Sequence, residues 1–228
     1  MMIKQTSIII LLLGVTLGSC IKHEVIPAPE PTADLKGEFQ GTIGGAYIEY
    51  TENVNGYYCA PSIAMQTSAG ITDAQYLFAM ISQSDASYMQ VGIGSLSWND
   101  PTGTSTPALT LFNQFFDKDA PTTSAPNYSN NALTGFEVAY SDTYGDVWKS
   151  DEINSTVQDV SFVYESISQE SDNSGDYSKF TCNFATEVFH TYSVIDITIS
   201  PQTNPPTMVD SLASIMITDA QYKGYFKR

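Results

Sequence analysis

Basic residues are scarce in this chain, and their scarcity narrows the classes of partner. The 228-residue sequence has 9 Lys and Arg against 25 Asp and Glu, which gives a formal net charge of −16. A strongly negative protein repels phosphate backbones and anionic lipid surfaces. The composition therefore argues against nucleic-acid binding and against docking of the folded domain on anionic lipid.

The residues that most often carry catalysis are also few. The chain has two histidines, His23 and His190, and three cysteines. A Ser-His-Asp or Cys-His site would have to use His190, because His23 lies close to the N-terminus. No Gly-x-Ser-x-Gly elbow, Walker loop or dinucleotide fingerprint occurs. The sequence therefore predicts a protein without a cofactor that is not an enzyme, although carboxylates paired for glycoside hydrolysis need not be close in sequence.

Residues 1–20 have the features of an export leader. Lys4 gives a positive start, and an unbroken apolar run covers residues 8–13. This stretch is short for a membrane-spanning helix, which favours a removable signal peptide. The leader ends in Leu17-Gly18-Ser19-Cys20, which resembles the lipobox of bacterial lipoproteins. The resemblance implies cleavage before Cys20 and lipid attachment to its thiol; the alternative is a chance cysteine after an ordinary secretory signal.

An acylated Cys20 predicts a protein held on a membrane by its lipid. Residue 21 is Ile rather than the Asp associated with inner-membrane retention, and residues 20–24 (CIKHE) loosely resemble a surface-export signal of Bacteroidota lipoproteins. We expect an outer-membrane lipoprotein on the cell surface, with the periplasmic face as the alternative. The expected parts are a signal peptide (1–19), a lipidated N-terminus with a Pro-rich linker (20–35), and a single β domain (36–228).

Short segments of alternating polarity follow the linker and predict an all-β domain. Gly44-Gly45 and the stretch SDTYG (141–145) predict two hairpins. The other expected strands are 61–66, 75–82, 88–97, 158–167, 178–189, 193–199, 212–218 and 221–227. This pattern is typical of an antiparallel β-sandwich or a barrel-like sandwich.

One helix is expected near residues 107–117. Thr106 and Pro107 supply a cap and a first-turn proline, and Leu109, Phe112 and Phe116 follow at helical spacing. We expect this aromatic stripe to close one end of the core.

Six short segments combine strand and turn patterns: GEFQGTI (37–43), ALTLFNQFF (108–116), GFEVAY (135–140), DTYGDVW (142–148), GDYSKFTCNF (175–184) and KGYF (223–226). Together with the lipobox they resemble small outer-membrane or surface lipoproteins of Bacteroidota with uncharacterised β domains. The resemblance implies a β fold and an address in the envelope, with no known activity to transfer.

Aromatic and amide side chains near loops are candidates for binding sugar rings. Trp98 precedes Asn99 and Asp100 at the expected end of a strand, and Tyr57 and Tyr58 lie near another loop. Apolar sugar faces stack on aromatic rings, so these five residues form a candidate glycan platform. The alternative for each aromatic residue is a half-buried ring packed on a sheet.

Two acidic turns are calcium candidates. Asp172 and Asp176 flank Asn-Ser-Gly, and Asp142 and Asp146 lie in a second turn. Neither matches the spacing of an EF-hand loop, and the same residue types are typical of hairpin turns. We therefore favour turn chemistry and predict no metal site.

Three further positions concern covalent chemistry. Cys59 and Cys182 form an even pair once Cys20 carries lipid, so they are either bridged or two separate buried thiols. Asp210-Ser211-Leu212 resembles the O-glycosylation motif of Bacteroidota, and Ser211 follows a Pro-rich stretch that we expect to be exposed.

The sequence thus predicts a lipid-anchored, non-enzymatic envelope protein. We expect the domain to bind a glycan or an envelope protein, with membrane contact through its N-terminal lipid. A glycan hydrolase with paired carboxylates and a purely structural envelope protein are the alternatives. A cleft with opposed carboxylates, a flat aromatic platform or an apolar patch would distinguish these functions.

Overall fold

The computed structural model describes residues 32–117, 127–130, 135–151, 162–195 and 208–228. The leader, Cys20 and the linker up to residue 31 lie outside these residues. The described part forms ten antiparallel strands and one short helix, which confirms the predicted all-β class. The elements are β1 (Glu38–Ile43), β2 (Ala46–Thr51), β3 (Tyr57–Ser68), β4 (Ile71–Ser82), β5 (Tyr88–Asn99), α2 (Leu109–Phe115), β6 (Phe136–Ser141), β7 (Val147–Ser150), β8 (Phe162–Asp172), β9 (Gly175–Ile195) and β10 (Met208–Lys227).

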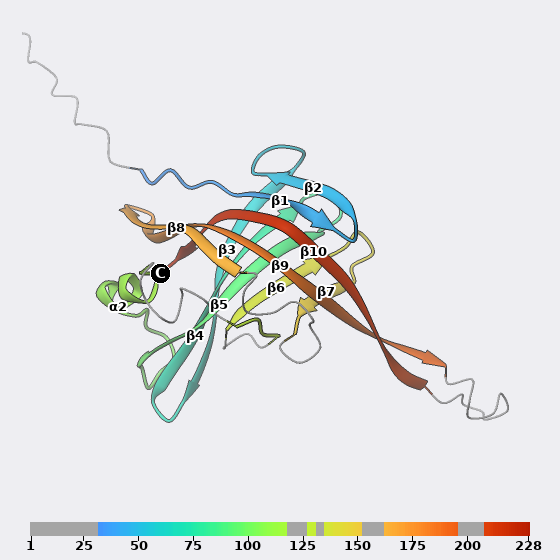
Figure 1. Cartoon of the computed structure of the whole chain (residues 1–228). Helices are drawn as coiled ribbons and strands as arrows, with labels where there is room; N and C mark the ends of the chain where they lie inside the picture. The colour runs from blue at the N-terminus through green and yellow to red at the C-terminus, as the bar shows by residue number, and fades with distance from the viewer. Residues whose placement is uncertain (1–31, 118–126, 131–134, 152–161, 196–207) are drawn as a thin grey trace, which may run out of the picture. The chain divides into compact units, whose positions relative to one another are not determined.

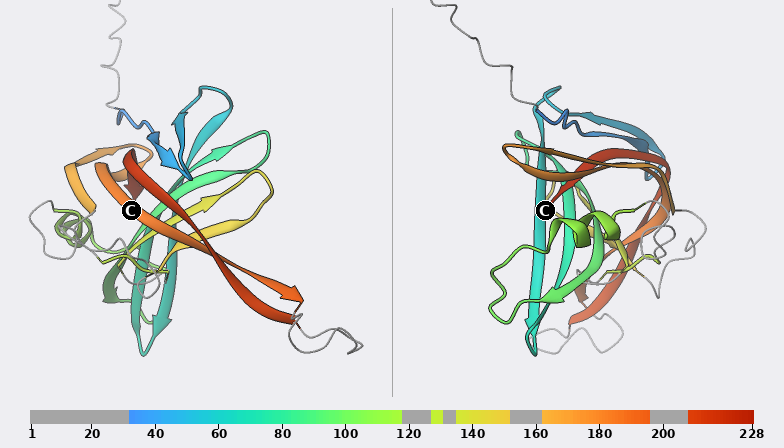
Figure 2. Two further views of the ribbon diagram at one scale, coloured as in Figure 1. Left: turned by 45° about the vertical axis from the view of Figure 1, so that its right-hand side comes forward. Right: turned by 90° about the vertical axis from the view of Figure 1, so that its left-hand side faces the viewer.

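All ten strands belong to one sheet. Their spatial order is β2-β1-β10-β9-β7-β6-β5-β4-β3, and β8 pairs with β9 beside this path. The sheet curls into a half-barrel (Figures 1 and 2), so that one sheet supplies both walls of the core. The two end strands β2 and β3 approach each other at a seam, where Tyr50 and Tyr57 stack with their ring centroids 4.3 Å apart.

Alternation along the strands builds an aromatic core inside the curl. On β4, Tyr76, Phe78 and Met80 are fully buried, because every second residue faces inward. The Phe78 ring reaches the opposite wall, with its centroid 5.9 Å from Phe180 of β9 and 5.6 Å from Tyr222 of β10. These contacts hold the two walls of the half-barrel together.

Helix α2 closes one end of the core, as predicted, but with a different start and a different face. It begins at Leu109 after Ala108, whose side chain makes no capping hydrogen bond, so the predicted Thr106 cap is wrong. Leu109 is exposed, and Phe115 is buried beside Phe112 instead. Of the described residues, none belongs to a helix with the length and apolarity to span a membrane.

Strands β9 and β10 run for 21 and 20 residues, whereas the other strands have 12 or fewer. Beyond the body of the sheet they continue as a two-stranded ribbon (Figure 1). The sequence divided each into two strands, at 189–193 and at 218–221, and both divisions are wrong. In β10 the cause is a bulge at Asp219, which has a φ of 52° and shifts the register between Ile217 and Ala220.

Candidate functional site

Five strands bring polar side chains into one row on the outward face of the sheet. The strand register places five residues side by side: Thr51 of β2, Glu38 of β1, Lys223 of β10, Thr181 of β9 and Ser166 of β8. Residues directly opposite each other in antiparallel strands share a face, so all five side chains point the same way. Their strand neighbours, such as Phe39 and Tyr222, point into the core.

Residues 32–37, here called the strap, cross one end of this row before β1 begins. The Ala33 amide donates to Asp172 Oδ2 at 2.8 Å, and the Gly37 amide donates to Glu52 Oε2 at 3.2 Å. Hydrogen bonds from the Ser174 hydroxyl and from the Ala33 amide lower the pKa of Asp172 to about 2. The strap is therefore fixed at both ends, to the β8–β9 turn and to the end of β2.

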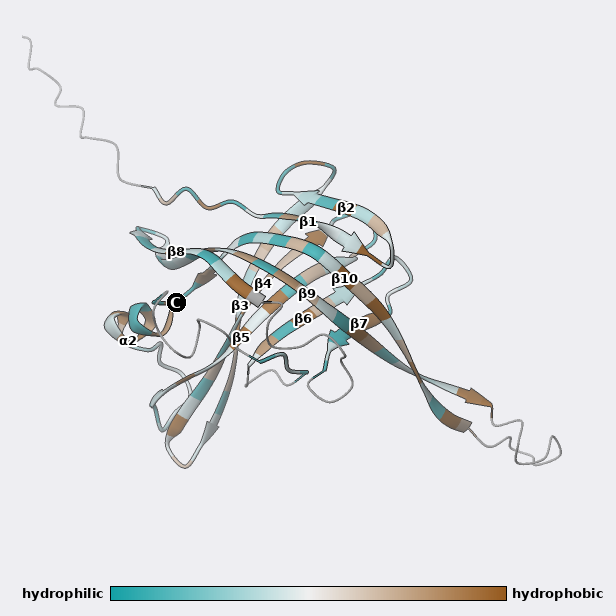
Figure 3. Cartoon of the chain, viewed as in Figure 1, coloured by the Kyte–Doolittle hydropathy of each residue, from teal (hydrophilic) through white to brown (hydrophobic). Residues whose placement is uncertain are grey.

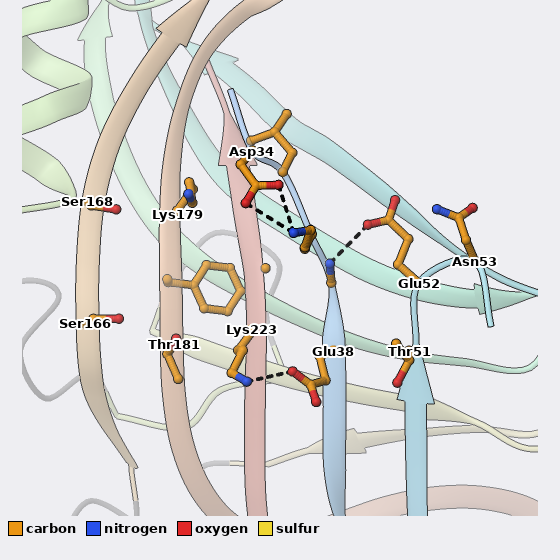
Figure 4. A pocket seen from close by; sticks show the side chains of 15 residues that line it. Asp34, Glu38, Thr51, Glu52, Asn53, Ser166, Ser168, Lys179, Thr181 and Lys223 are labelled. Atoms are coloured by element: carbon orange, nitrogen blue, oxygen red, sulfur yellow. Dashed lines mark hydrogen bonds and ion pairs between the residues drawn. The ribbon is translucent and has the colours of Figure 1, made fainter. Parts of the chain in front are cut away.

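A pocket of about 540 Å³ lies between the strap and the outward face of β8, β9 and β10 (Figure 4). It is lined by Asp34, Leu35, Lys36, Gly37, Glu38, Thr51, Glu52, Asn53, Ser166, Ser168, Lys179, Phe180, Thr181, Lys223 and Gly224. Most of these residues present hydroxyl, amide, ammonium or carboxylate groups to the space. We call it the strap pocket.

Cations and carboxylates alternate around the strap pocket. Lys223 lies 2.6 Å from Glu38, and Lys36 lies 3.1 Å from Asp34. The third lysine of the pocket, Lys179, lies 2.7 Å from the carboxylate of Glu170, which is outside the pocket lining. Six basic residues fall in the described part of the chain, and three of them line this pocket. On a strongly acidic protein the strap pocket is thus a place where positive and negative groups balance.

A second polar row lies two residues further along the same strands. The Gln40 amide donates to Gln221 Oε1 at 3.2 Å, and Gln221 donates in turn to Asn183 Oδ1 at 3.3 Å. This amide row borders a shallow hollow of about 470 Å³. Since Gln221 and Lys223 are about 7 Å apart along β10, the hollow and the strap pocket share one continuous polar face.

Sequence reasoning missed this face. Each of its residues is an ordinary outward-facing polar residue of a strand, and strand alternation alone gives no reason to single it out. Glu38 and Lys223 are 185 positions apart in the sequence, and only the β1–β10 register brings them together. The available signal is that Lys36, Lys179 and Lys223 are basic residues in a chain with only 9 Lys and Arg.

The predicted glycan platform is not assembled. Trp98 lies opposite Thr72 at the start of β4, whereas Tyr57 lies opposite Ser82 at its end. These ends are about 33 Å apart along the strand. Tyr58 is exposed next to Tyr57, but it is equally far from the Trp98 loop.

The residues after Trp98 serve their own turn. Asp100 is buried, and its carboxylate accepts hydrogen bonds from the Thr102 and Ser105 amides. Trp98 Nε1 donates to the Ser105 hydroxyl at 3.2 Å, and Asn99 is the last residue of β5, opposite Ile71. Asp100 is therefore not available as a ligand-binding group.

The two acidic turns use their carboxylates internally. Asp172 accepts from the Ser174 amide and hydroxyl in addition to the strap, and Asp176 pairs with Arg228 at 2.6 Å. In the β6–β7 turn, Asp142 accepts from the Asp146 amide at 3.1 Å. Among the described residues no three His, Cys, Asp or Glu side chains gather closely enough to hold a metal ion.

The remaining candidates have structural surroundings. His190 Nδ1 lies 2.9 Å from the Val147 carbonyl, and its ring packs against Trp148. Cys182 is buried and Cys59 is half-buried, and both are free thiols with no bond between them. Ser211 lies inside β10 opposite Tyr192 and is half-buried, and the Pro-rich stretch before it lies outside the described residues.

Fold and site together define a curled antiparallel half-barrel with a strapped polar pocket on its outer face. The chain matches no protein-family model, no curated protein and no solved structure.

Proposed function

We propose that this chain is a lipid-anchored envelope protein whose β domain binds a saccharide in the strap pocket without catalysing its turnover. The observation that carries the proposal is the row Thr51, Glu38, Lys223, Thr181 and Ser166, which combines three hydroxyls with a carboxylate and an ammonium group across five strands. A sugar hydroxyl is both a donor and an acceptor, so a mixed lining of this kind matches it on every side.

Charge and size favour a neutral, hydroxyl-rich ligand. The three lysines of the strap pocket are matched by carboxylates, which leaves no excess positive charge for an anion. The volume of about 540 Å³ lies within the ~300–1,000 Å³ range of small-molecule sites. The adjoining amide row offers further hydrogen bonds to a chain longer than one sugar.

Binding can be tested by titrating the purified, lipidated protein in detergent with a panel of neutral and acidic oligosaccharides. We expect calorimetric binding of a neutral oligosaccharide, weakened at least tenfold by Lys223→Met or Thr181→Val. Lys227→Met removes the same charge from the same strand outside the pocket, and should leave the affinity unchanged. Binding of no saccharide, or an equal loss in Lys227→Met, would refute the proposal.

The same incubations separate the alternative functions. Three carboxylates line the strap pocket, namely Asp34, Glu38 and Glu52, so a glycan hydrolase is the second candidate. Mass analysis of the oligosaccharide after incubation should show it intact. Shortened products that disappear on replacing one of these carboxylates would establish the hydrolase instead.

The proposed location in the cell envelope depends on the leader sequence, and it can be tested separately from saccharide binding. We expect Cys20→Ala to abolish membrane association, because the thiol that accepts the lipid is gone. Fractionation of cells that express each form measures this directly. A Cys20→Ala chain that still sediments with the outer membrane would contradict the anchor, whatever the pocket binds.

A further inference from the structure

The ribbon at the far ends of β9 and β10 exposes apolar side chains. We call residues 190–195 and 208–216 the arm. Five of its apolar residues are exposed by 39–57%, namely Tyr192, Ile195, Met208, Val209 and Leu212. Figure 3 shows hydrophobic residues, coloured brown, at the end of the ribbon, away from the body of the sheet. Met208, Ile195 and Leu212 lie on one face of the ribbon, and Val209 and Tyr192 lie on the other. Exposed apolar side chains gathered in this way are typical of an interaction site.

The arm also presents an open backbone edge on β10. The Gly44 amide donates to the Met216 carbonyl, and this is the last bond between β10 and the β1 hairpin. Every second residue from Met216 back to Met208 points its amide and carbonyl to the same side. No described strand lies along that side of residues 208–215. At the two ends of the sheet, β3 carries Pro61 and β2 carries the charged Glu49, and both residue types discourage edge pairing.

Charge indicates what can approach the arm. Asp210 is its only charged residue, on a chain with a net charge of −16. Amphipathic segments that lie on membranes carry Lys or Arg on their polar face, and the arm has neither. Two copies of this chain repel each other over most of their surface, and the arm is where that repulsion is weakest.

We propose that two copies of this chain associate by pairing the β10 edges of their arms antiparallel about a two-fold axis at Leu212. In this register Val209 of each copy lies opposite Ile215 of the other, and Asp210 lies opposite Ser214. The two Asp210 carboxylates are thereby displaced from each other by about 14 Å along the strands. The pairing forms about six backbone hydrogen bonds, and it is isologous, as in most homodimers.

The size of the arm sets the strength of this dimer. The arm exposes five large apolar side chains, whereas each partner in a stable complex of standard size contributes about 20–30 residues. We therefore expect a reversible dimer. The lipid anchoring proposed above would favour it by raising the local concentration of the two copies on one surface.

Cysteine cross-linking of the full-length protein in its own membrane tests the register. Leu212→Cys places two thiols on the axis with Cα atoms about 5.5 Å apart, within the range of a disulfide. Mild oxidation should convert this variant to a covalent dimer. Asp210→Cys lies on the same edge with the same backbone direction, but off the axis, and should cross-link at least tenfold less.

Each other outcome overturns the proposal. Equal yields of covalent dimer from the two cysteine variants would indicate random collision. The absence of a dimer from Leu212→Cys would show that the arms do not pair in this register. A covalent product with another protein would show that the arm has a different partner. Leu212→Pro removes an amide that bonds to no described residue, so it should keep the melting temperature and abolish the native dimer in sedimentation. A proline variant that still dimerises would also refute the pairing.

Discussion

Gly224 of β10 lies directly over the ring of Phe78, and this contact supports the floor of the strap pocket. A Cβ atom added at residue 224 would overlap the Cδ1 and Cε1 atoms of Phe78. The ring has little room to move, because it also contacts Phe180, Tyr222 and Tyr225 at centroid distances of 5.1–5.9 Å. The substitution Gly224→Ala therefore forces β10 away from the core.

Overpacking a rigid core by one methyl group costs about 1–3 kcal/mol, and the crowded ring places this site at the upper end. We expect Gly224→Ala to lower the free energy of unfolding by about 2–3 kcal/mol, which lowers the melting temperature by roughly 5–10 °C for a domain of this size. Urea denaturation of the purified protein, followed by tryptophan fluorescence, measures the loss.

A double-mutant cycle isolates the cause. Phe78→Leu shortens the side chain and opens space beside residue 224, so adding Gly224→Ala to it should cost at least ~1 kcal/mol less than adding it to the native chain. If Gly224→Ala costs under ~0.5 kcal/mol, or if the two changes are simply additive, the contact does not limit how closely β10 approaches the core.

Three other changes probe separate features of the fold. Lys149→Met leaves the buried carboxylate of Glu137 without its cation. Burial raises the pKa of Glu137 and the lysine opposes this shift. Urea unfolding should therefore show a loss in the free energy of unfolding of about 1–3 kcal/mol, and the loss should be larger at pH 7 than at pH 4. Burial raises the pKa of the Cys59 thiol to about 12 and raises that of Cys182 further. Maleimide should therefore label neither thiol in the folded protein at pH 7.5, and both after denaturation without reductant. Fewer than two labelled thiols in the denatured protein would establish a disulfide. The pKa of Asp172 is depressed in the folded protein, so its carboxylate stabilises the strap at pH values above the ordinary carboxyl pKa of ~4. Asp172→Asn should therefore speed amide exchange in the strap at neutral pH. The difference from the native protein should vanish as the pH falls to about 2.

The sequence was informative wherever a strand has one buried and one exposed face. The hairpin around Gly44-Gly45 and the hairpin across SDTYG both form as predicted. Alternation failed where geometry interrupts it: at the Asp219 bulge two inward residues, Ile217 and Ala220, are separated by two positions instead of one. In β9 the exposed residues 191–193 resemble a turn because the arm leaves the core there, although the strand continues to Ile195.

The candidate site was beyond the reach of sequence patterns for a different reason. Its residues become a site through register between strands that are distant in the chain, and their types are those of any solvated sheet face. Conversely, Trp98 and Tyr57 looked like a platform because aromatic residues near loops are conspicuous, and β4 holds them at opposite ends.

The pairing of β1 with β10 also has a consequence for the order in which the strands fold. Among the described strands, β10 is the one that pairs with the hairpin of β1 and β2, and Glu38 lies opposite Lys223. Contacts between such distant segments form slowly, because a long stretch of chain must be ordered first. Synthesis must therefore pass residue 223 before the β1–β2 hairpin can dock on β10. The strap pocket, which combines residues 34–38 with Lys223 and Gly224, therefore assembles late in folding.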